Sequence, residues 1–157
     1  MDEDTLPVGM RELMNRAIDE ATRNGSGAVE GEHVLLALLS EPRSPAARIA
    51  ADGGLDHDGL LEALRAERVH SLKSAGITAI DASRLQSTPR TRQRPTWGAS
   101  IRTLMTEART ANRGPRHRMT DQDMFVAILR TELGTVPRAL DLAGIDRAAL
   151  ITRLSQA

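Results

Sequence analysis

The chain has 157 residues, a formal net charge of zero and no cysteine, and its aromatic residues are one Trp and one Phe. This length suits one domain, and the scarcity of aromatic residues disfavours a β-sandwich or barrel, so we expect an all-helical core. The lack of cysteine excludes disulfides, thiol catalysis and cysteine-ligated metal. No apolar run approaches the ~20 residues of a membrane span. The acidic start, Met1–Asp4, is unlike a signal peptide, so we expect a cytoplasmic protein.

Four helices are predicted in the first half of the chain. The first covers residues 8–23, where apolar residues recur with the 3.6-residue period of an amphipathic helix. The second starts near residues 30–32 and runs to Leu39, and it is apolar on nearly every side, which indicates a buried helix. A short third helix over residues 45–51 begins with proline, and a fourth runs from about residue 56 to 67.

The second half is predicted to repeat this order of long, buried, short and final helices. Its first helix covers residues 95–111, Thr120 is the expected N-cap of the buried helix, Pro137 starts the short helix, and Asp146 caps the last one. The expected domain organisation is a first repeat over residues 6–66, a basic and partly flexible linker over 67–94, and a second repeat over 95–155.

An internal duplication supports this division. The segment from Val29 to Leu64 matches Met119 to Leu154 without a gap, at an offset of 90 residues. Coinciding residues include Ala37 and Ala127, Leu39 and Leu129, Leu35 and Phe125, Arg48 and Arg138, Gly54 and Gly144, and Asp56 and Asp146. An upstream block matches at an offset of 87, so the second copy holds three extra residues within 112–118, where a loop is expected. The sequence therefore predicts two pseudo-symmetric four-helix repeats in one compact domain.

The neutral net charge hides an asymmetry along the chain. Residues 1–62 hold thirteen Asp or Glu and five Arg, whereas residues 68–94 hold six Lys or Arg and only Asp81. A basic run of this kind is compatible with a solvated linker or with a nucleic-acid-associated regulator. The run lacks interleaved aromatic residues, and the apolar helix over 32–39 has no Arg, Lys, Asn or Gln to read base edges. We therefore expect no specific nucleic-acid binding.

The ordered motifs resemble a known family. They are Ala-Ile-Asp-Glu-Ala at 17–21, Val-Glu-Gly-Glu-His-Val-Leu-Leu-Ala-Leu-Leu at 29–39 and Ala-Ala-Arg at 46–48, followed by a Gly-Leu turn. This pattern resembles the Clp N-terminal repeat of AAA+ unfoldases such as ClpA and ClpC, in which the unit occurs twice. Glu32-His33 matches the Glu-His of the family motif, whereas Gln122 stands at the position of that glutamate in the second copy.

The resemblance implies an N-terminal docking module that receives substrates, adaptor proteins, cyclic peptides and phosphoarginine-tagged proteins. The sequence contains no Gly-x-x-x-x-Gly-Lys-Ser/Thr loop for nucleotide phosphates, so we expect neither an enzyme nor a cofactor. The expected function is a monomeric, non-catalytic peptide- or protein-binding module of the Clp system. It would act as an adaptor that delivers clients, or as a decoy that sequesters ligands of the unfoldase N-domain, and its partners would be Clp subunits, clients or peptides.

The resemblance also indicates a candidate binding surface at the seam between the first helices of the two units. The positions that match it are Met14, Ile18, Arg102 and Met105, with Trp97 near the edge and Glu32 as a separate guanidinium-binding candidate. The alternative interpretation is that methionines at helical spacing belong to the core. Glu32 and His33 are adjacent in a helix and cannot converge on one atom, so we expect His33 to pack at a helix start and no metal site to form.

Overall fold

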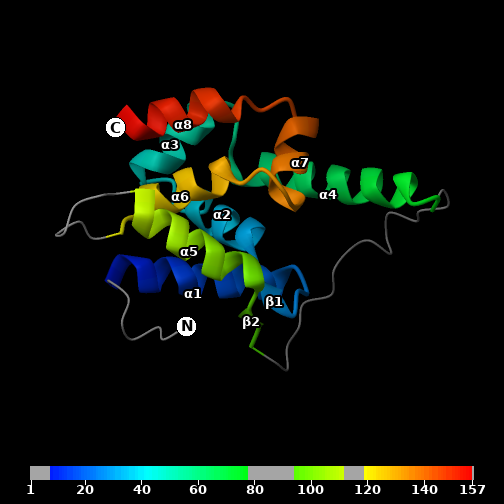
Figure 1. Ribbon diagram of the computed structural model, residues 1–157, viewed down its shortest axis with the longest axis horizontal. Helices are drawn as coiled ribbons and strands as arrows, with labels where there is room; N and C mark the ends of the chain where they lie inside the picture. Colours follow the sequence, from blue (N-terminus) through cyan, green and yellow to red (C-terminus); the bar gives the residue numbers. More distant parts are fainter. Residues whose placement is uncertain (1–7, 78–93, 112–118, 157) are drawn as a thin grey trace.

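The computed structural model describes residues 8–77, 94–111 and 119–156. Within these ranges the chain forms eight helices and two very short strands (Figure 1). The elements are α1 (Val8–Arg23), β1 (Ala28–Val29), α2 (Gly31–Leu39), α3 (Pro45–Asp52), α4 (His57–Ser74), β2 (Thr96–Trp97), α5 (Ala99–Ala111), α6 (Asp121–Arg130), α7 (Thr135–Leu142) and α8 (Arg147–Gln156). The prediction of an all-α fold is confirmed.

The order of helices α1–α4 is repeated by α5–α8, and the repetition extends to single hydrogen bonds. Gly54 after α3 and Gly144 after α7 both have a positive φ, of 84° and 69°, which a residue with a Cβ rarely adopts. The amide of the next residue then reaches back to the preceding helix: Leu55 N–H donates to Ala50 O at 2.8 Å, and Ile145 N–H donates to Leu140 O at 3.0 Å. The predicted two-repeat architecture is confirmed.

The buried helices α2 and α6 lie at the centre, and each contacts helices of both repeats. The matched residues Leu35 of α2 and Phe125 of α6 are both fully buried. The last helix of each repeat crosses over to the short helix of the other, because α4 packs on α7 and α8 packs on α3. The two repeats therefore share one core, in which neither half buries its apolar residues alone.

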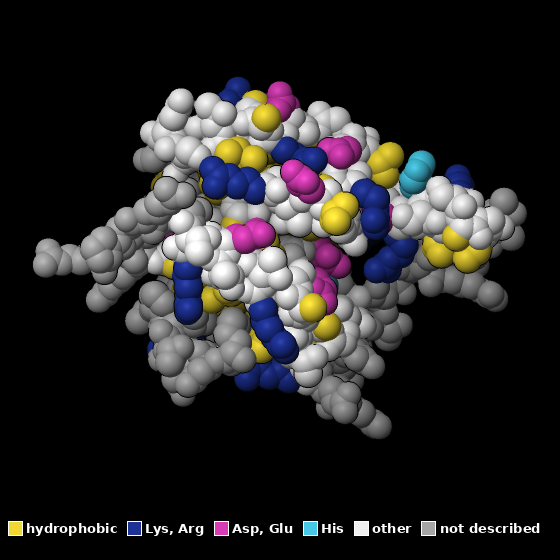
Figure 2. Space-filling view, viewed as in Figure 1, with side chains coloured by type: hydrophobic (Ala, Val, Ile, Leu, Met, Phe, Trp, Pro, Cys, Tyr) yellow, Lys and Arg dark blue, Asp and Glu magenta, His cyan; other side chains and the backbone are white. Residues whose placement is uncertain are grey.

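Three helix boundaries differ from the sequence prediction, and one of them is the start of α7, which lies at Thr135 instead of Pro137. Helix α4 continues to Ser74 instead of ending at Glu67, because no helix-breaking residue precedes Gly76. Its outer end extends beyond the body of the molecule, and Figure 2 shows hydrophobic side chains exposed there. Helix α5 begins at Ala99 rather than at residue 95, because residues 96 and 97 pair in parallel with β1. This pairing was not predicted.

The extra loop residues 112–118 and most of the predicted linker lie outside the described residues. Within the described ranges, no helix combines the length and the apolar character that crossing a membrane requires.

Candidate functional site

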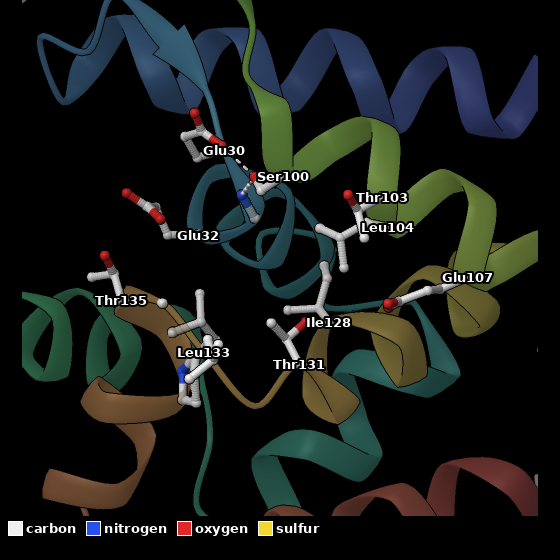
Figure 3. Close-up of a pocket in the computed structure, with 14 residues that line it drawn as sticks. Glu30, Glu32, Ser100, Thr103, Leu104, Glu107, Ile128, Thr131, Leu133 and Thr135 are labelled. Carbon is white, nitrogen blue, oxygen red and sulfur yellow. Dashed lines mark hydrogen bonds between the residues drawn. The ribbon is translucent and has the colours of Figure 1, made fainter.

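A cavity of about 350 Å³ opens where the two repeats meet (Figure 3). The first repeat contributes the start of α2 (residues 30–32), and the second contributes one face of α5, the end of α6 and the loop into α7. Leu104 and Ile128 lie in the middle of the cavity, with Glu32 on one side and Glu107 on the other. Leu133 stands at the rim with 86% of its surface exposed. The cavity thus has an apolar floor and an acidic border.

The second repeat fixes one of these acids. The hydroxyl of Ser100 donates to the carboxylate of Glu30 and accepts the amide N–H of Gly31 at 3.2 Å. Gly98 makes this possible, because a Cβ at that position would collide with the Glu30 carboxylate. Glu30 is therefore engaged in joining α2 to α5 and is not free to bind a ligand.

Glu32 differs from Glu30, because its carboxylate has no hydrogen bond or ion pair with another side chain among the described residues, and its hydrogen-bond partner is its own backbone N–H. Burial raises the pKa of the Glu32 carboxyl above its usual value, and the nearby charge of Glu30 adds to this effect. Arg68 on α4 is the nearby cation that opposes the shift. Glu32 thus offers a partly desolvated carboxylate with unused hydrogen-bonding capacity.

His33 has a structural role at the start of α2. Its side chain is buried, and its Nδ1 accepts the backbone N–H of Glu30 at 3.0 Å, which leaves the ring proton on Nε2. Burial lowers the pKa of His33 from 6.5 to about 4, so the ring is neutral near pH 7. Among the described residues, no group of three His, Asp or Glu side chains is arranged to hold a metal ion.

The equivalent place in the second repeat, at the start of α6, is organised differently. Thr120 and Asp123 form the capping box there. Gln122, which matches Glu32, donates from its side-chain amide to the backbone carbonyl of Leu154 in α8. Arg16 of α1, which matches Thr103 of α5, places its guanidinium 3.9 Å from the carboxylate of Asp121. In the second repeat, side chains of the protein itself therefore occupy the place that corresponds to the surroundings of Glu32.

The residues predicted for the seam between α1 and α5 are mostly in the core. Met14, Ile18 and Met105 have only 1%, 9% and 5% of their surface exposed, as the alternative interpretation of the methionine pattern expected. Arg102 is exposed, and Trp97 is half-buried on β2. Of the six predicted site residues, Glu32 alone lines the cavity.

The sequence prediction missed the α5 face of the cavity, which carries Ser100, Thr103, Leu104 and Glu107. These residues recur at spacings of three and four, which is typical of one helix face. Their mixed polarity resembles an ordinary surface, so the spacing alone gave no signal. The loop 131–135 was also missed, since nothing in its sequence places it opposite Glu32.

Comparison with known proteins identifies the family. The sequence model described as the Clp repeat (R) N-terminal domain matches residues 8–93. The fold is similar to the crystal structure of the N-terminal domain of the caseinolytic protease associated chaperone ClpD from Arabidopsis thaliana. That match has a TM-score of 0.68 and 18% identity, and it covers 99% of this chain and 96% of that one. No curated protein sequence matches the chain.

The chain belongs to the Clp repeat N-terminal domain family. This membership defines the class of protein, which is a protein-interaction module of the Clp system. The likeness to ClpD extends over both repeats but, at this level of identity, concerns the fold alone.

Proposed function

We propose that this protein is a non-catalytic peptide- or protein-binding module of the Clp protease system, and that the cavity between its repeats receives the ligand. The observation that carries the proposal is the half-buried carboxylate of Glu32, which has no side-chain partner among the described residues and borders an open apolar floor. A buried acid without a partner is costly, and a ligand that supplies a cation removes that cost. Figure 2 shows acidic side chains gathered around the hollow between α5 and α7.

The geometry supports a particular ligand chemistry. Leu104, Ile128 and Val136 suit an apolar side chain of a peptide, while Glu32 suits a basic group beside it. The second repeat offers an internal comparison, because there Arg16 brings a guanidinium to the equivalent acidic helix start. The matching residue in the cavity is Thr103, which is too short and uncharged to do the same. A guanidinium or ammonium of the bound partner would take that place.

Two modes of action fit this module, and both are part of the proposal. An adaptor would deliver clients and stimulate their degradation by a Clp unfoldase and its protease. A decoy would capture ligands meant for the unfoldase N-domain, so that it relieves a toxic ligand without changing basal proteolysis. In both modes the protein is monomeric, needs no cofactor and performs no chemistry on its ligand.

The first test is co-purification of the protein with its partners from its native host. A Clp subunit, a client protein or a peptide is expected to be retained. Binding to an array of short peptides that combine apolar residues with arginine, glutamine or glutamate then tests the site. Arginine peptides should be retained best, and Glu32→Gln should weaken them, whereas Glu12→Gln on the exposed face of α1 serves as the matched control. If nothing co-purifies and no peptide is retained, the proposal fails.

The rival function is a nucleic-acid-associated regulator that uses the basic linker. Most of that linker lies outside the described residues, and the buried state of α2 argues against groove reading, since eight of its nine residues are buried. A gel-shift assay at physiological salt, with random and host promoter fragments, separates the two functions. Sequence-selective retention of DNA would favour the regulator over the docking module.

A further inference from the structure

An ion pair between the buried Glu67 and the exposed Arg138 lies beside the α7 wall of the cavity. Glu67 of α4 is only 4% exposed, and its Oε1 accepts the Nε–H of Arg138 at 2.8 Å and the hydroxyl of Ser71 at 2.6 Å. Burial raises the pKa of the Glu67 carboxyl, but the hydrogen bonds from Ser71 and Arg138 together bring it below its usual value. Glu67 therefore stays ionised near neutral pH, and it ties α4 of the first repeat to α7 of the second.

The ion pair lies next to the part of α7 that borders the cavity. Val136 and Pro137 line the cavity, and Arg138 is the next residue in the same helical turn. The loop before this turn is exposed from residue 132 to 134, and Gly134 has a φ of 117°. The exposed loop gives α7 little support on that side, so the ion pair of Arg138 and the buried side chains of Val136 and Ala139 together hold the first turn of α7.

The matching arginine of the first repeat is placed differently. Arg48 of α3 matches Arg138, but no ion pair of Arg48 occurs among the described residues. Arg48 is exposed on the α3 side of the molecule. Within the part of the chain that the structure describes, the ion pair therefore occurs at α7, which borders the cavity beside Glu32, and not at α3.

We propose that Glu67 and Arg138 are positioning residues, which hold the first turn of α7 at the distance from Glu32 that a bound peptide requires. This inference rests on the proposed function, because it assigns the pair to the same cavity. In the unbound protein, the pair restrains α7 more than it restrains the rest of the core.

The test compares Arg138→Gln and Glu67→Gln with Asp141→Asn. Asp141 lies on the same helix and pairs with Arg147 at 3.3 Å, but it does not line the cavity, so it is the matched control. Amide hydrogen exchange reports the restraint on α7 through residues 139–142, and the arginine peptides of the array report affinity. Both measurements are made well below the unfolding temperature of each variant.

The Arg138→Gln and Glu67→Gln variants should exchange faster in α7 than in α1 and α2 and should bind the peptides about three- to tenfold more weakly. Arg138→Lys, which keeps the charge, should recover part of the affinity. The inference is wrong if exchange in α7 is unchanged, or if it rises only together with exchange in α1 and α2. It is also wrong if a peptide-binding wild type and the Gln variants bind equally well. Failure of the wild type to bind any peptide would instead count against the proposed function, and the exchange data would still decide whether the pair restrains α7.

Discussion

The starts of helices α2 and α6 occupy equivalent places in the two repeats but leave different surfaces. Both helices follow an extended N-cap residue and are preceded by matching apolar positions. At α6, Gln122 is bonded to the carbonyl of Leu154, and Arg16 approaches Asp121. At α2, Glu32 has no such partner among the described residues and borders a cavity.

This difference shows how few residues separate a closed helix junction from an open one. Asp121 replaces Gly31, Gln122 replaces Glu32, and Arg16 replaces Thr103 when the repeats are matched. The order of the helices and the positive-φ turns at Gly54 and Gly144 remain the same. A duplicated domain can therefore keep one half closed for stability and leave the other half open for binding.

In the core the two repeats should not differ, because they share one set of buried side chains. Phe125→Ala and Leu35→Ala remove fully buried side chains at matched positions, and each should cost about 3–5 kcal/mol of unfolding free energy. Because the repeats share one core, each variant should unfold in a single transition when helicity is followed in urea. Separate transitions for the two halves would contradict the shared core.

The two helix starts should also differ in their response to acid. Burial lowers the pKa of His33 in the folded protein from 6.5 to about 4, so its contribution to stability is full above pH 6.5 and is lost as the pH falls towards 4. This loss amounts to about 3 kcal/mol. Urea unfolding near neutral pH and near pH 4 should show it in the wild type.

The matched control for the acid response is His33→Gln, since a glutamine oxygen can also accept the Glu30 N–H. This variant should lose less stability on acidification than the wild type by about the same amount. An equal loss in both proteins would show that His33 is not responsible. The second repeat has Asp123 at this position instead of a histidine.

Exchanging the matched residues Glu32 and Gln122 should have opposite effects. Gln122→Glu places a carboxylate against the Leu154 carbonyl and removes a donor, so it should destabilise the fold by about 1–3 kcal/mol. Glu32→Gln removes a half-buried charge that has no side-chain partner, so the free energy of unfolding should stay within about 0.5 kcal/mol or rise. Urea unfolding of both variants measures the contrast, and equal destabilisation would mean that the two sites are alike.

The smallest effect is expected at Arg16. Its guanidinium lies 3.9 Å from Asp121, and both side chains are about one-third exposed, so Arg16→Thr should cost less than about 1 kcal/mol. The effect should shrink further at high salt, because salt screens a partly exposed pair. A loss of several kcal/mol in thermal unfolding would show instead that Arg16 is a core residue.

Much of the fold followed from the sequence, because it rests on local signals and on the duplication. The bounds of α1, the proline at the start of α3, the Thr120 cap and the matched glycines at 54 and 144 were all predicted correctly. The length of α4 was wrong, because the composition of residues 68–74 resembles a polar linker as much as an exposed helix. The β1–β2 pair was missed, since two residues carry no periodicity.

The site was harder to predict than the fold. Met14 and Met105 satisfy the pattern of a binding stripe and of a core equally well, and only packing distinguishes the two. The cavity depends on how α5, the 131–135 loop and α7 come together around Glu32, which are contacts between residues far apart in the chain. Sequence reasoning selected Glu32 through the family motif but had no means of finding its surroundings.

The most direct test of the central claim is an NMR titration of the isotope-labelled protein with the best arginine peptide from the array. The largest changes in backbone chemical shift should occur at residues 30–32 and 131–137. Glu32→Gln should reduce these shift changes, whereas Glu12→Gln should not. Shifts concentrated at Arg102 and Trp97, or at residues 120–122 of the second repeat, would contradict the assignment of the binding site to this cavity.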